Sequence, residues 1–248
     1  MDDRYVTAGQ VTRCEHCSIR NRAVCGALHQ EELAQLDRIA RRKLVSTGET
    51  ILSDQEPAKF FGNIVSGVVK LTKTLADGRQ QIVGLQFAPD FVGRAYSVSN
   101  RYFAEAATDV ELCFFPRSEF ERLLVAFPGL EHRLFERTLH ELDAAREWML
   151  LLGRKTAEEK VASFLLMLAR RSALIGCADD RDPNEARFAM PLTRSDMADF
   201  LGLTIETVSR QITRLKVRHI IRAVDSRSFL VPNLMALNDA AGQDPDDL

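Results

Sequence analysis

The sequence predicts an α+β protein in which an N-terminal antiparallel β-domain is followed by a long helix and a C-terminal helical domain. Three patterns lead to this prediction. Short apolar or alternating runs, broken by Gly, Asp and Pro, extend from Leu44 to Phe115, as in a β-roll, sandwich or barrel. Helical spacing of apolar residues returns at Arg117. Residues 191–221 then read as two short helices joined by a tight turn.

Composition places the chain among ordinary globular proteins. Its 248 residues are 46% hydrophobic and 27% charged, which suffices for a core in one or two domains. The sequence has no apolar run of the roughly 18 residues that a membrane span needs, and its first ten residues do not resemble a secretory signal. We therefore expect a cytoplasmic protein with no membrane partner. The formal net charge of -2 does not by itself indicate a nucleic-acid partner.

A short helix and a hairpin turn are the clearest local signals in the first half. Gln30 to Lys43 carries apolar residues at helical spacing, with acids early and bases late as the helix dipole prefers. Asp77-Gly78 predicts a hairpin turn, because Gly tolerates the positive φ that such turns require.

A long helix is predicted from Leu130 to Leu152, after a short helix from Arg117 to Phe127 and a break at Pro128-Gly129. Six residues of this helix recur at seven-residue intervals, in two sets offset by three positions. This pattern is typical of an a/d seam between two copies of the chain. Because the seam is short, we expect a marginal, adjustable homodimer. The alternative is that this face packs on the chain's own β-domain. The seam residues are Phe135, Thr138, Leu142, Ala145, Met149 and Leu152.

The helical pattern is interrupted at Gly153 to Lys155, where we expect a domain boundary. Thr156-Ala-Glu-Glu159 then has the form of a capping box that opens a helix through about Ala173. Residues 177–187 read as a polar loop, and the acidic end from Asn238 is predicted to lack fixed structure.

Residues 191–221 have helix-turn-helix geometry. Thr193 with Asp196 can cap the first helix, Gly202 lies at the turn, and Thr204 can cap a second helix to about His219. Five bases and one acid lie between Thr204 and Arg222, so the local formal charge is +4. Residues 222–232 read as a β-wing whose Arg227 could approach phosphate.

The second of these helices has two faces. One is expected to be buried and carries Ile205, Val208, Ile212 and Leu215. On the other face, an Arg guanidinium can donate two hydrogen bonds to guanine, a Glu carboxylate can accept one from cytosine, and a Ser hydroxyl can bond several base edges. A solvated face with a Glu206–Arg210 pair is the alternative. We expect double-stranded DNA to be contacted by Thr204, Glu206, Ser209, Arg210, Thr213 and Arg214.

A β-roll, a long dimer helix, a hinge and a helix-turn-helix in this order resemble the CRP/FNR superfamily of transcription regulators. Glu206-Thr-Val-Ser209-Arg210 matches the E-x-x-S-R form of FNR. The resemblance implies a β-roll like that of cyclic-nucleotide-binding domains, a winged helix-turn-helix, and a symmetric dimer on an inverted repeat of the TTGAT-N4-ATCAA kind. It also implies an RNA polymerase partner, contacted through the turn at Asp77, Gly78 and Arg79 and the loop at 179–185, although ordinary solvated loops are an equal interpretation.

Three of the five cysteines lie near the N-terminus with the spacing C-x2-C-x7-C, and in a reducing compartment such a cluster indicates metal ligation or redox chemistry. With Cys113, the pattern resembles the FnrL/FnrN branch of FNR-type oxygen sensors. The resemblance implies an oxygen-labile [4Fe-4S] cluster that supports dimerisation and DNA binding, and that air converts to [2Fe-2S] and then to clusterless monomers. Its implied ligands are Cys14, Cys17, Cys25 and Cys113.

Strand alternation supports the assignment of Cys113, since it places Val110, Leu112 and Phe114 on the core face and Cys113 on the opposite one. The alternative is a packed cysteine under the N-terminal segment. Cys177 lies outside the motif and is expected not to be a ligand. Four thiolates alone do not exclude zinc.

Two positions qualify the resemblance. Residues 91–96 (FVGRAY) do not have the acid of a cyclic-nucleotide phosphate site, so we expect no cyclic nucleotide. Ala145 stands where some FNR proteins carry an acid that keeps the clusterless form monomeric, so complete monomerisation is in doubt and a residual clusterless dimer is expected.

The sequence therefore predicts an oxygen-responsive regulator of anaerobic or microaerobic genes, and not an enzyme, because it contains no nucleotide-loop, zinc-protease or serine-hydrolase motif. The alternative is a CRP-like regulator that senses haem ligands or another small molecule, with structural or zinc-bound cysteines. The expected segments are a cluster-binding segment (1–29), a β-roll (30–129), a dimerisation helix (130–153), a DNA-binding domain (154–238) and an acidic tail (239–248).

Overall fold

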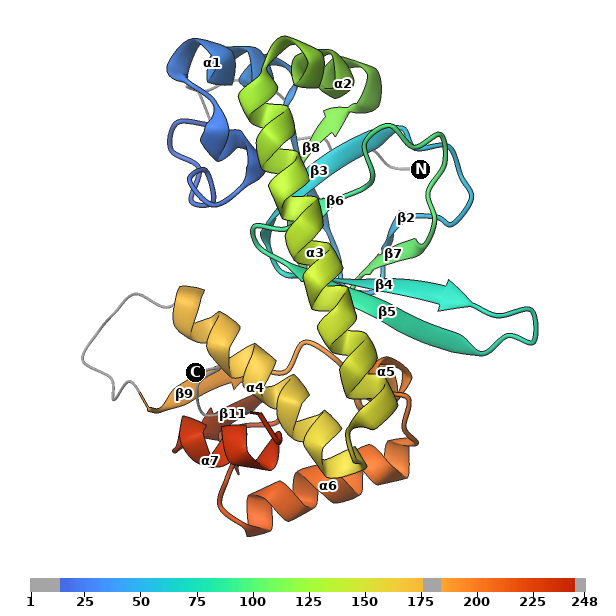
Figure 1. Ribbon diagram of the computed structural model, residues 1–248, viewed down its shortest axis with the longest axis vertical. Helices are drawn as coiled ribbons and strands as arrows, with labels where there is room; N and C mark the ends of the chain where they lie inside the picture. The colour runs from blue at the N-terminus through green and yellow to red at the C-terminus, as the bar shows by residue number, and fades with distance from the viewer. Residues whose placement is uncertain (1–13, 176–183, 244–248) are drawn as a thin grey trace. The chain divides into compact units, whose positions relative to one another are not determined.

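The structure is a computed structural model that describes residues 14–175 and 184–243 (Figure 1). The chain divides into two compact units, residues 1–145 and 146–248. The long helix α3 (Pro128–Arg154) contributes to both units. None of the helices in the described part of the chain combines the length and apolar character that a membrane-spanning helix requires.

In its described residues, the first unit contains two four-stranded antiparallel sheets, which confirms the predicted β-roll. In one sheet the order is β1 (Arg41–Val45), β8 (Val110–Pro116), β3 (Phe60–Ser66) and β6 (Phe91–Val92). In the other it is β2 (Thr50–Leu52), β7 (Phe103–Ala106), β4 (Val68–Thr74) and β5 (Gln80–Phe87). The short strands β6 and β7 were not predicted.

Strand β8 has a hydrophobic cluster on each of its faces. Val110 and Leu112 belong to the core between the sheets, whereas Cys113 and Phe115 belong to a second cluster under the N-terminal segment. Cys113 therefore does face away from the inner core, but it is buried. Phe114, predicted on the core face, is only half-buried, and its ring meets the edge of Phe60 with centroids 5.7 Å apart.

Four helical segments complete the first unit: η1 (Val24–Ala27), α1 (Gln30–Ile39), α2 (Arg117–Ala126) and the first part of α3. The helix predicted to reach Lys43 ends at Ile39, because Arg41–Val45 pair with β8 as a strand instead. The predicted break between the two helices is present, but it lies at Phe127 and not at Pro128-Gly129. Pro128 and Gly129 lie in the first turn of α3, where the missing N–H of Pro costs nothing.

The second unit is a winged helix-turn-helix domain. Its sheet has the order β10–β11–β9, and its residues pack around buried Phe164, Met197 and Leu215. The elements are α4 (Ala157–Ile175), β9 (Ala186–Ala189), α5 (Arg194–Leu201), α6 (Ile205–Val217), β10 (Arg222–Ala223), β11 (Ser228–Val231) and α7 (Leu234–Ala240).

The ends of this unit differ from the sequence expectations. The division between units falls within α3, before the predicted hinge at Gly153, because the Trp148 ring stacks on Phe200 with centroids 4.0 Å apart. The chain from Asn238, predicted to lack fixed structure, continues α7 to Ala240, and Asn238 is buried. Three parts of the chain lie outside the described residues: Cys177, the first residues of the polar loop at 179–185, and the last five residues.

The N-terminal segment folds as tight turns around Gly26. Backbone N–H groups of Arg20 and Ala23 donate to the carbonyls of Cys17 and Ile19 at 3.0 and 2.8 Å. A Cβ at Gly26 would lie 2.8 Å from the Arg20 carbonyl oxygen, which is too close for any other residue. Only glycine lets these turns close beside Cys25.

We predict that Gly26→Ala loosens this segment. The added methyl group must push backbone apart, which should lower the free energy of local opening by about 1 to 3 kcal/mol. Hydrogen exchange of the backbone amides of residues 17–28 measures this free energy of local opening. Gly153→Ala is the control, because its Cβ would meet no atom within 4 Å. Unchanged protection in Gly26→Ala would contradict the interpretation.

Candidate metal centre and nucleic-acid interface

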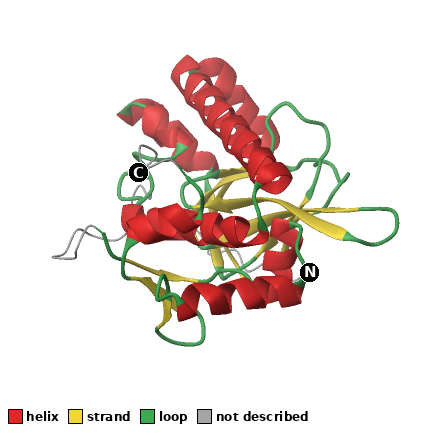
Figure 2. Cartoon of the chain, turned by 60° about the horizontal axis from the view of Figure 1, so that its bottom comes forward, coloured by secondary structure: helices red, strands yellow, loops and turns green. Residues whose placement is uncertain are grey.

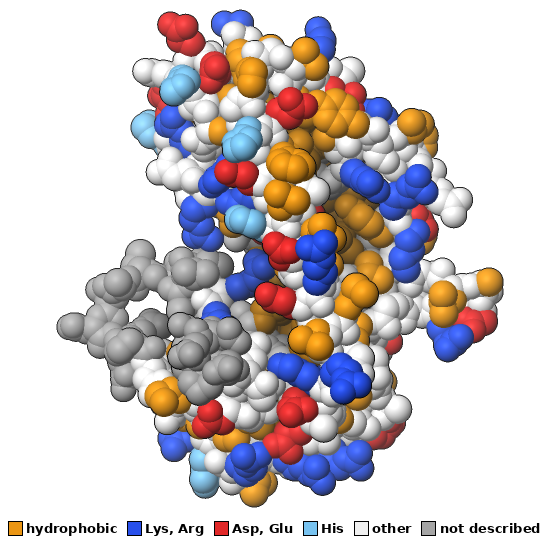
Figure 3. Space-filling view, in the orientation of Figure 1, with side chains coloured by type: hydrophobic (Ala, Val, Ile, Leu, Met, Phe, Trp, Pro, Cys, Tyr) orange, Lys and Arg blue, Asp and Glu red, His pale blue; other side chains and the backbone are white. Residues whose placement is uncertain are grey.

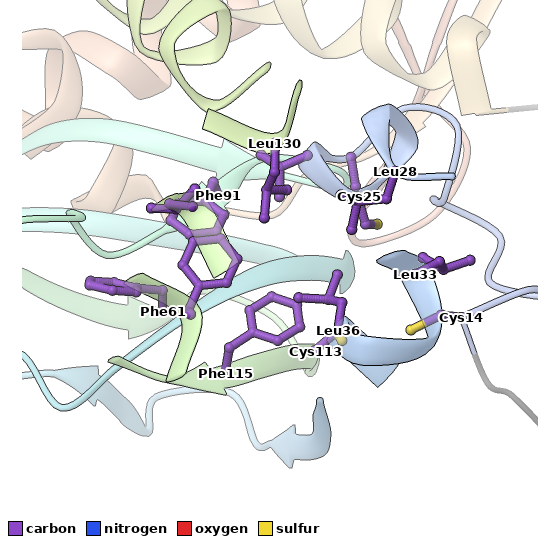
Figure 4. Packing of buried hydrophobic residues seen from close by; sticks show 14 of the residues in the cluster. Cys14, Cys25, Leu28, Leu33, Leu36, Phe61, Phe91, Cys113, Phe115 and Leu130 are labelled. Atoms are coloured by element: carbon purple, nitrogen blue, oxygen red, sulfur yellow. The ribbon is translucent and has the colours of Figure 1, made fainter. Parts of the chain in front are cut away.

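The structure brings the four sequence-predicted cysteines into one neighbourhood. Cys14, Cys25 and Cys113 are buried in the second hydrophobic cluster, and the partly buried Cys17 packs against it. Cys17 and Cys25 both raise the pKa of Cys113, and Cys25 and Cys113 both raise that of Cys14, as neighbouring thiolates do. In Figure 4 the labelled cysteines lie at the end of the cluster that Leu33 and Leu36 occupy, whereas Phe61 and Phe91 fill the other end.

Burial raises the pKa of Cys14, Cys25 and Cys113 and so favours their neutral thiols. It raises the pKa of Cys25 to about 11 and that of Cys113 to about 12, and it raises the pKa of Cys14 further. The nearby Arg42 guanidinium opposes this rise for Cys113 and Cys25. A metal centre would therefore have to displace protons from the thiols on binding.

The four thiols are donors that both zinc and iron–sulfur centres take. Within residues 14–175 and 184–243, no three or more His, Cys, Asp or Glu side chains are arranged to hold one metal ion. Four cysteines sharing a dry, buried neighbourhood are the ligands that iron–sulfur clusters take.

Two polar side chains flank Cys113 across the sheet. Strand pairing places Arg42 of β1 opposite Cys113 on one side and Asn63 of β3 opposite it on the other. The Nη2 of Arg42 donates to the Sγ of Cys17 at 3.3 Å, and its Nη1 donates to Glu111 at 2.6 Å. Asn63 is 1% exposed, and its Oδ1 has no hydrogen-bond partner. An orphaned buried amide costs roughly 1 to 3 kcal/mol, so its presence calls for an explanation.

The cysteine segment contacts the beginning of α3. Leu130, fully buried, and Leu134 belong to the same hydrophobic cluster as the cysteines. One turn further along, Arg137 donates from Nη2 to the backbone carbonyl of Arg22, which lies between Cys17 and Cys25. Any rearrangement of the cysteine segment must therefore alter the packing of α3.

The predicted seam is largely uncovered in the single chain. Phe135, Leu142 and Met149 are 59%, 45% and 71% exposed. Thr138 and Ala145 are exposed as well, and Leu152 is half-buried. Figure 3 shows hydrophobic side chains along the course of α3. Such an apolar stripe is typical of an interface.

The helix-turn-helix forms as the capping residues predict. Thr193 Oγ1 accepts from the Asp196 N–H at 3.1 Å, and the Thr193 N–H donates to the Asp196 carboxylate at 3.1 Å. Gly202 ends α5 with φ of 61°, the left-handed conformation that glycine favours. Thr204 caps α6 by accepting from the Thr207 N–H at 3.2 Å.

Helix α6 has the predicted polar face, with one correction on its buried face. Val208, Ile212 and Leu215 are buried, but Ile205 is 46% exposed because it is the first residue of the helix and lies beyond the core; buried Gln211 was not predicted. Hydrogen bonds from the helix start and Thr204 lower the pKa of Glu206, so it is ionised at neutral pH. The exposed residues are Thr204, Glu206, Ser209, Arg210, Thr213 and Arg214.

The wing adds a second basic position. The Asp225 carboxylate accepts from the backbone N–H of Arg227 at 2.8 Å and of Ser228 at 2.7 Å, which leaves the Arg227 side chain exposed at the tip. Figure 3 shows Lys and Arg side chains gathered where Figure 1 places α6.

The predicted hairpin turn is present and exposed. Gly78 has φ of 87°, and Asp77 accepts from the Arg79 N–H at 3.1 Å. Figure 2 shows this hairpin extending beyond the rest of its sheet.

Carboxylates surround the stretch at 91–96. The Tyr96 N–H donates to Glu121 at 3.1 Å, and the Tyr96 hydroxyl donates to Glu131 at 2.9 Å. A phosphate at this position would meet two acids.

Comparisons with known proteins agree with this architecture. Residues 42–126 match the family described as cyclic nucleotide-binding domain, and residues 159–240 match the Crp-like helix-turn-helix domain. The solved structure of FixK2 from Bradyrhizobium japonicum superposes with a TM-score of 0.73 and 34% identity, covering 82% of this chain and 97% of that one.

Curated relatives cover nearly the whole chain. A probable transcriptional activator of Rhizobium leguminosarum bv. viciae is 46% identical, over 93% of both chains. The transcriptional activator protein FnrL of Cereibacter sphaeroides is 45% identical, over 94% of both. The fumarate and nitrate reduction regulatory protein of Escherichia coli K12 is 32% identical, over 96% of this chain and 94% of that protein. These relatives and the fold are those of DNA-binding regulators, not enzymes, and the chain belongs to the CRP/FNR family of transcription regulators.

Proposed function

We propose that this regulator senses oxygen through a [4Fe-4S] cluster and, as a homodimer, binds a TTGAT-N4-ATCAA-like inverted repeat to control anaerobic or microaerobic genes. One observation carries the proposal. Four thiols, three from an N-terminal segment and one from the distant strand β8, meet in a buried cluster that also contains the start of the long helix α3.

Cys14, Cys17, Cys25 and Cys113 would hold the cluster. When bound, the cluster supplies the sensitivity to oxygen. The surrounding Ile19, Ala23 and Val24 are at most 5% exposed and exclude water from the thiols. This dry environment favours the neutral thiols of Cys14, Cys25 and Cys113, so these three lose their protons only to a strongly bound metal centre.

Helix α3 would carry the signal to the dimer seam. Leu130, Leu134 and the Arg137–Arg22 contact join the cysteine segment to its first turns. The exposed seam follows directly along the helix. Because a short seam gives a marginal dimer, a coupling free energy of about 1 to 3 kcal/mol is enough to shift the equilibrium between monomer and dimer.

Helix α6 would read the DNA sequence. Glu206, Ser209 and Arg210 are exposed on one face, within reach of adjacent base pairs in a major groove. In a two-fold dimer, two such helices would reach half-sites about one helical turn apart. Arg227 on the wing would contact phosphate, which positions the domain without reading sequence.

Two further contacts complete the proposal. The exposed hairpin turn at Asp77, Gly78 and Arg79 is a candidate contact with RNA polymerase. No cyclic nucleotide is needed, because Glu121 and Glu131 already occupy the N–H and hydroxyl of Tyr96 and would repel a phosphate.

Cys113→Ser and Cys25→Ser should lose the cluster, because serine is a poor ligand for iron in these sites. Anaerobic absorption spectra with iron and sulfide analysis measure the loss. Cys177→Ser, outside the proposed ligand set, is the matched control and should retain both. Normal iron and sulfide in either ligand variant would refute the ligand assignment, and a colourless, zinc-loaded wild type would refute the cluster itself.

Arg210→Ala should weaken binding to the inverted repeat by about 1 to 3 kcal/mol per half-site, with little change on random DNA, because the guanidinium reads base edges. Arg227→Ala should weaken both equally and reduce the salt dependence by about one phosphate contact. Fluorescence anisotropy on both DNAs at several salt concentrations measures these effects. If Arg210→Ala lost the same affinity for both DNAs, Arg210 would be a phosphate contact and not a reader of base edges.

Leu142→Asp should abolish the anaerobic dimer, because it places a charge in the apolar seam of both copies. Ala144→Asp adds the same charge on an exposed position outside the seam and should leave the dimer intact. Sedimentation velocity of the cluster-loaded proteins distinguishes them. A Leu142→Asp dimer as stable as that of the control would rule out this seam.

A further inference from the structure

The fourth proposed ligand lies in a cross-strand row with two polar residues. Cys113 of β8 pairs directly with Arg42 of β1 and with Asn63 of β3. Directly paired residues of antiparallel strands project to the same face, with Cβ atoms about 4.5 to 5.5 Å apart. Both side chains therefore lie within reach of the sulfur atoms around Cys113.

Arg42 already donates a hydrogen bond to a proposed ligand. Its Nη2 lies 3.3 Å from the Sγ of Cys17, while the Glu111 carboxylate holds Nη1 at 2.6 Å. The Arg42 side chain is 21% exposed, so the guanidinium is largely withdrawn from solvent. Glu111 thus orients a cation toward the thiols rather than toward water.

Asn63, on the other side of Cys113, has one unsatisfied buried atom. It is 1% exposed, and its Oδ1 accepts no hydrogen bond. A buried amide without a partner is expected where a polar ligand normally completes its bonding. Because an Asn amide can turn about its last torsion, its NH2 group can donate to a sulfur atom next to Cys113.

We propose that Arg42 and Asn63 donate hydrogen bonds to the sulfur atoms of the bound cluster and thereby control how firmly it is held and how fast air removes it. The inference rests on the proposed function. Four thiolates give the buried centre a net negative charge, which burial disfavours. Donors on both sides of Cys113 offset that cost, as outer partners of metal ligands do elsewhere.

The two residues are positioning residues, and spectroscopy can distinguish this role from a purely structural one. Hydrogen bonds to a cysteine sulfur weaken its bond to iron. Removing a donor should therefore raise the Fe–S(Cys) stretching frequencies in the resonance Raman spectrum. It should also speed the loss of the visible band in air on the order of tenfold.

The experiment compares anaerobically reconstituted wild type with Asn63→Leu and Arg42→Met. Arg42→Lys retains the positive charge but not the planar guanidinium with its several N–H donors, so it should restore part of the wild-type behaviour. Arg41→Gln is the matched control and should behave as wild type, because the neighbouring Arg41 donates to the backbone carbonyls of Arg38 and Ala40 and not to a thiol. The melting temperature of the metal-free protein is measured in parallel.

Asn63→Leu should not lower that melting temperature, since an apolar side chain of similar size replaces an amide whose buried oxygen has no hydrogen-bond partner. Raised stretching frequencies with faster loss in Asn63→Leu and Arg42→Met are the expected result. Unchanged frequencies and rates in both variants, in a wild type that binds the cluster, would overturn this inference alone. A wild type that takes up no iron or sulfide would contradict the proposed function and this inference together.

Discussion

The packing of the N-terminal segment against strand β8 and the start of α3 is the contact on which the rest of the account depends. Ile19, Ala23, Val24 and Leu130 bury the thiols in an apolar cluster, where thiolates are unfavourable unless a metal centre neutralises them. Because the same cluster includes the start of α3, a change at the thiols also changes how α3 packs. This shared packing gives a physical route from a chemical event at the cysteines to assembly of the protein.

Each unit also exposes a surface that is suited to contact with a partner. Phe135 and Leu142 of α3 remain exposed in the single chain, and α6 presents a charged face held rigidly by two capped helices. A marginal interface is what a switch needs, since a strong seam would hold the dimer together whatever the state of the cysteines. In the proposed seam, the small, apolar Ala145 would oppose dimerisation of the cluster-free protein less than an acid would.

Local signals were predictable from the sequence, and long-range pairing was not. The caps at Thr193 and Thr204 and the turn at Gly78 depend on neighbouring residues and are present as predicted. Arg41–Val45 reads equally well as helix, and only its pairing with β8 makes it a strand. The row of Arg42, Cys113 and Asn63 likewise requires strand register, so neither flanking residue could be found from spacing. Ile205 fits helical periodicity but lies beyond the core at the end of α6.

Oxygen sensing through the buried thiols is tested most directly by measuring the affinity of one protein preparation for the inverted repeat before and after exposure to air, with iron content determined at both points. The account predicts that loss of iron weakens binding by about 5- to 150-fold, as expected for a coupling of 1 to 3 kcal/mol. Iron-free, air-exposed protein that binds the repeat as tightly as the anaerobic preparation would contradict it.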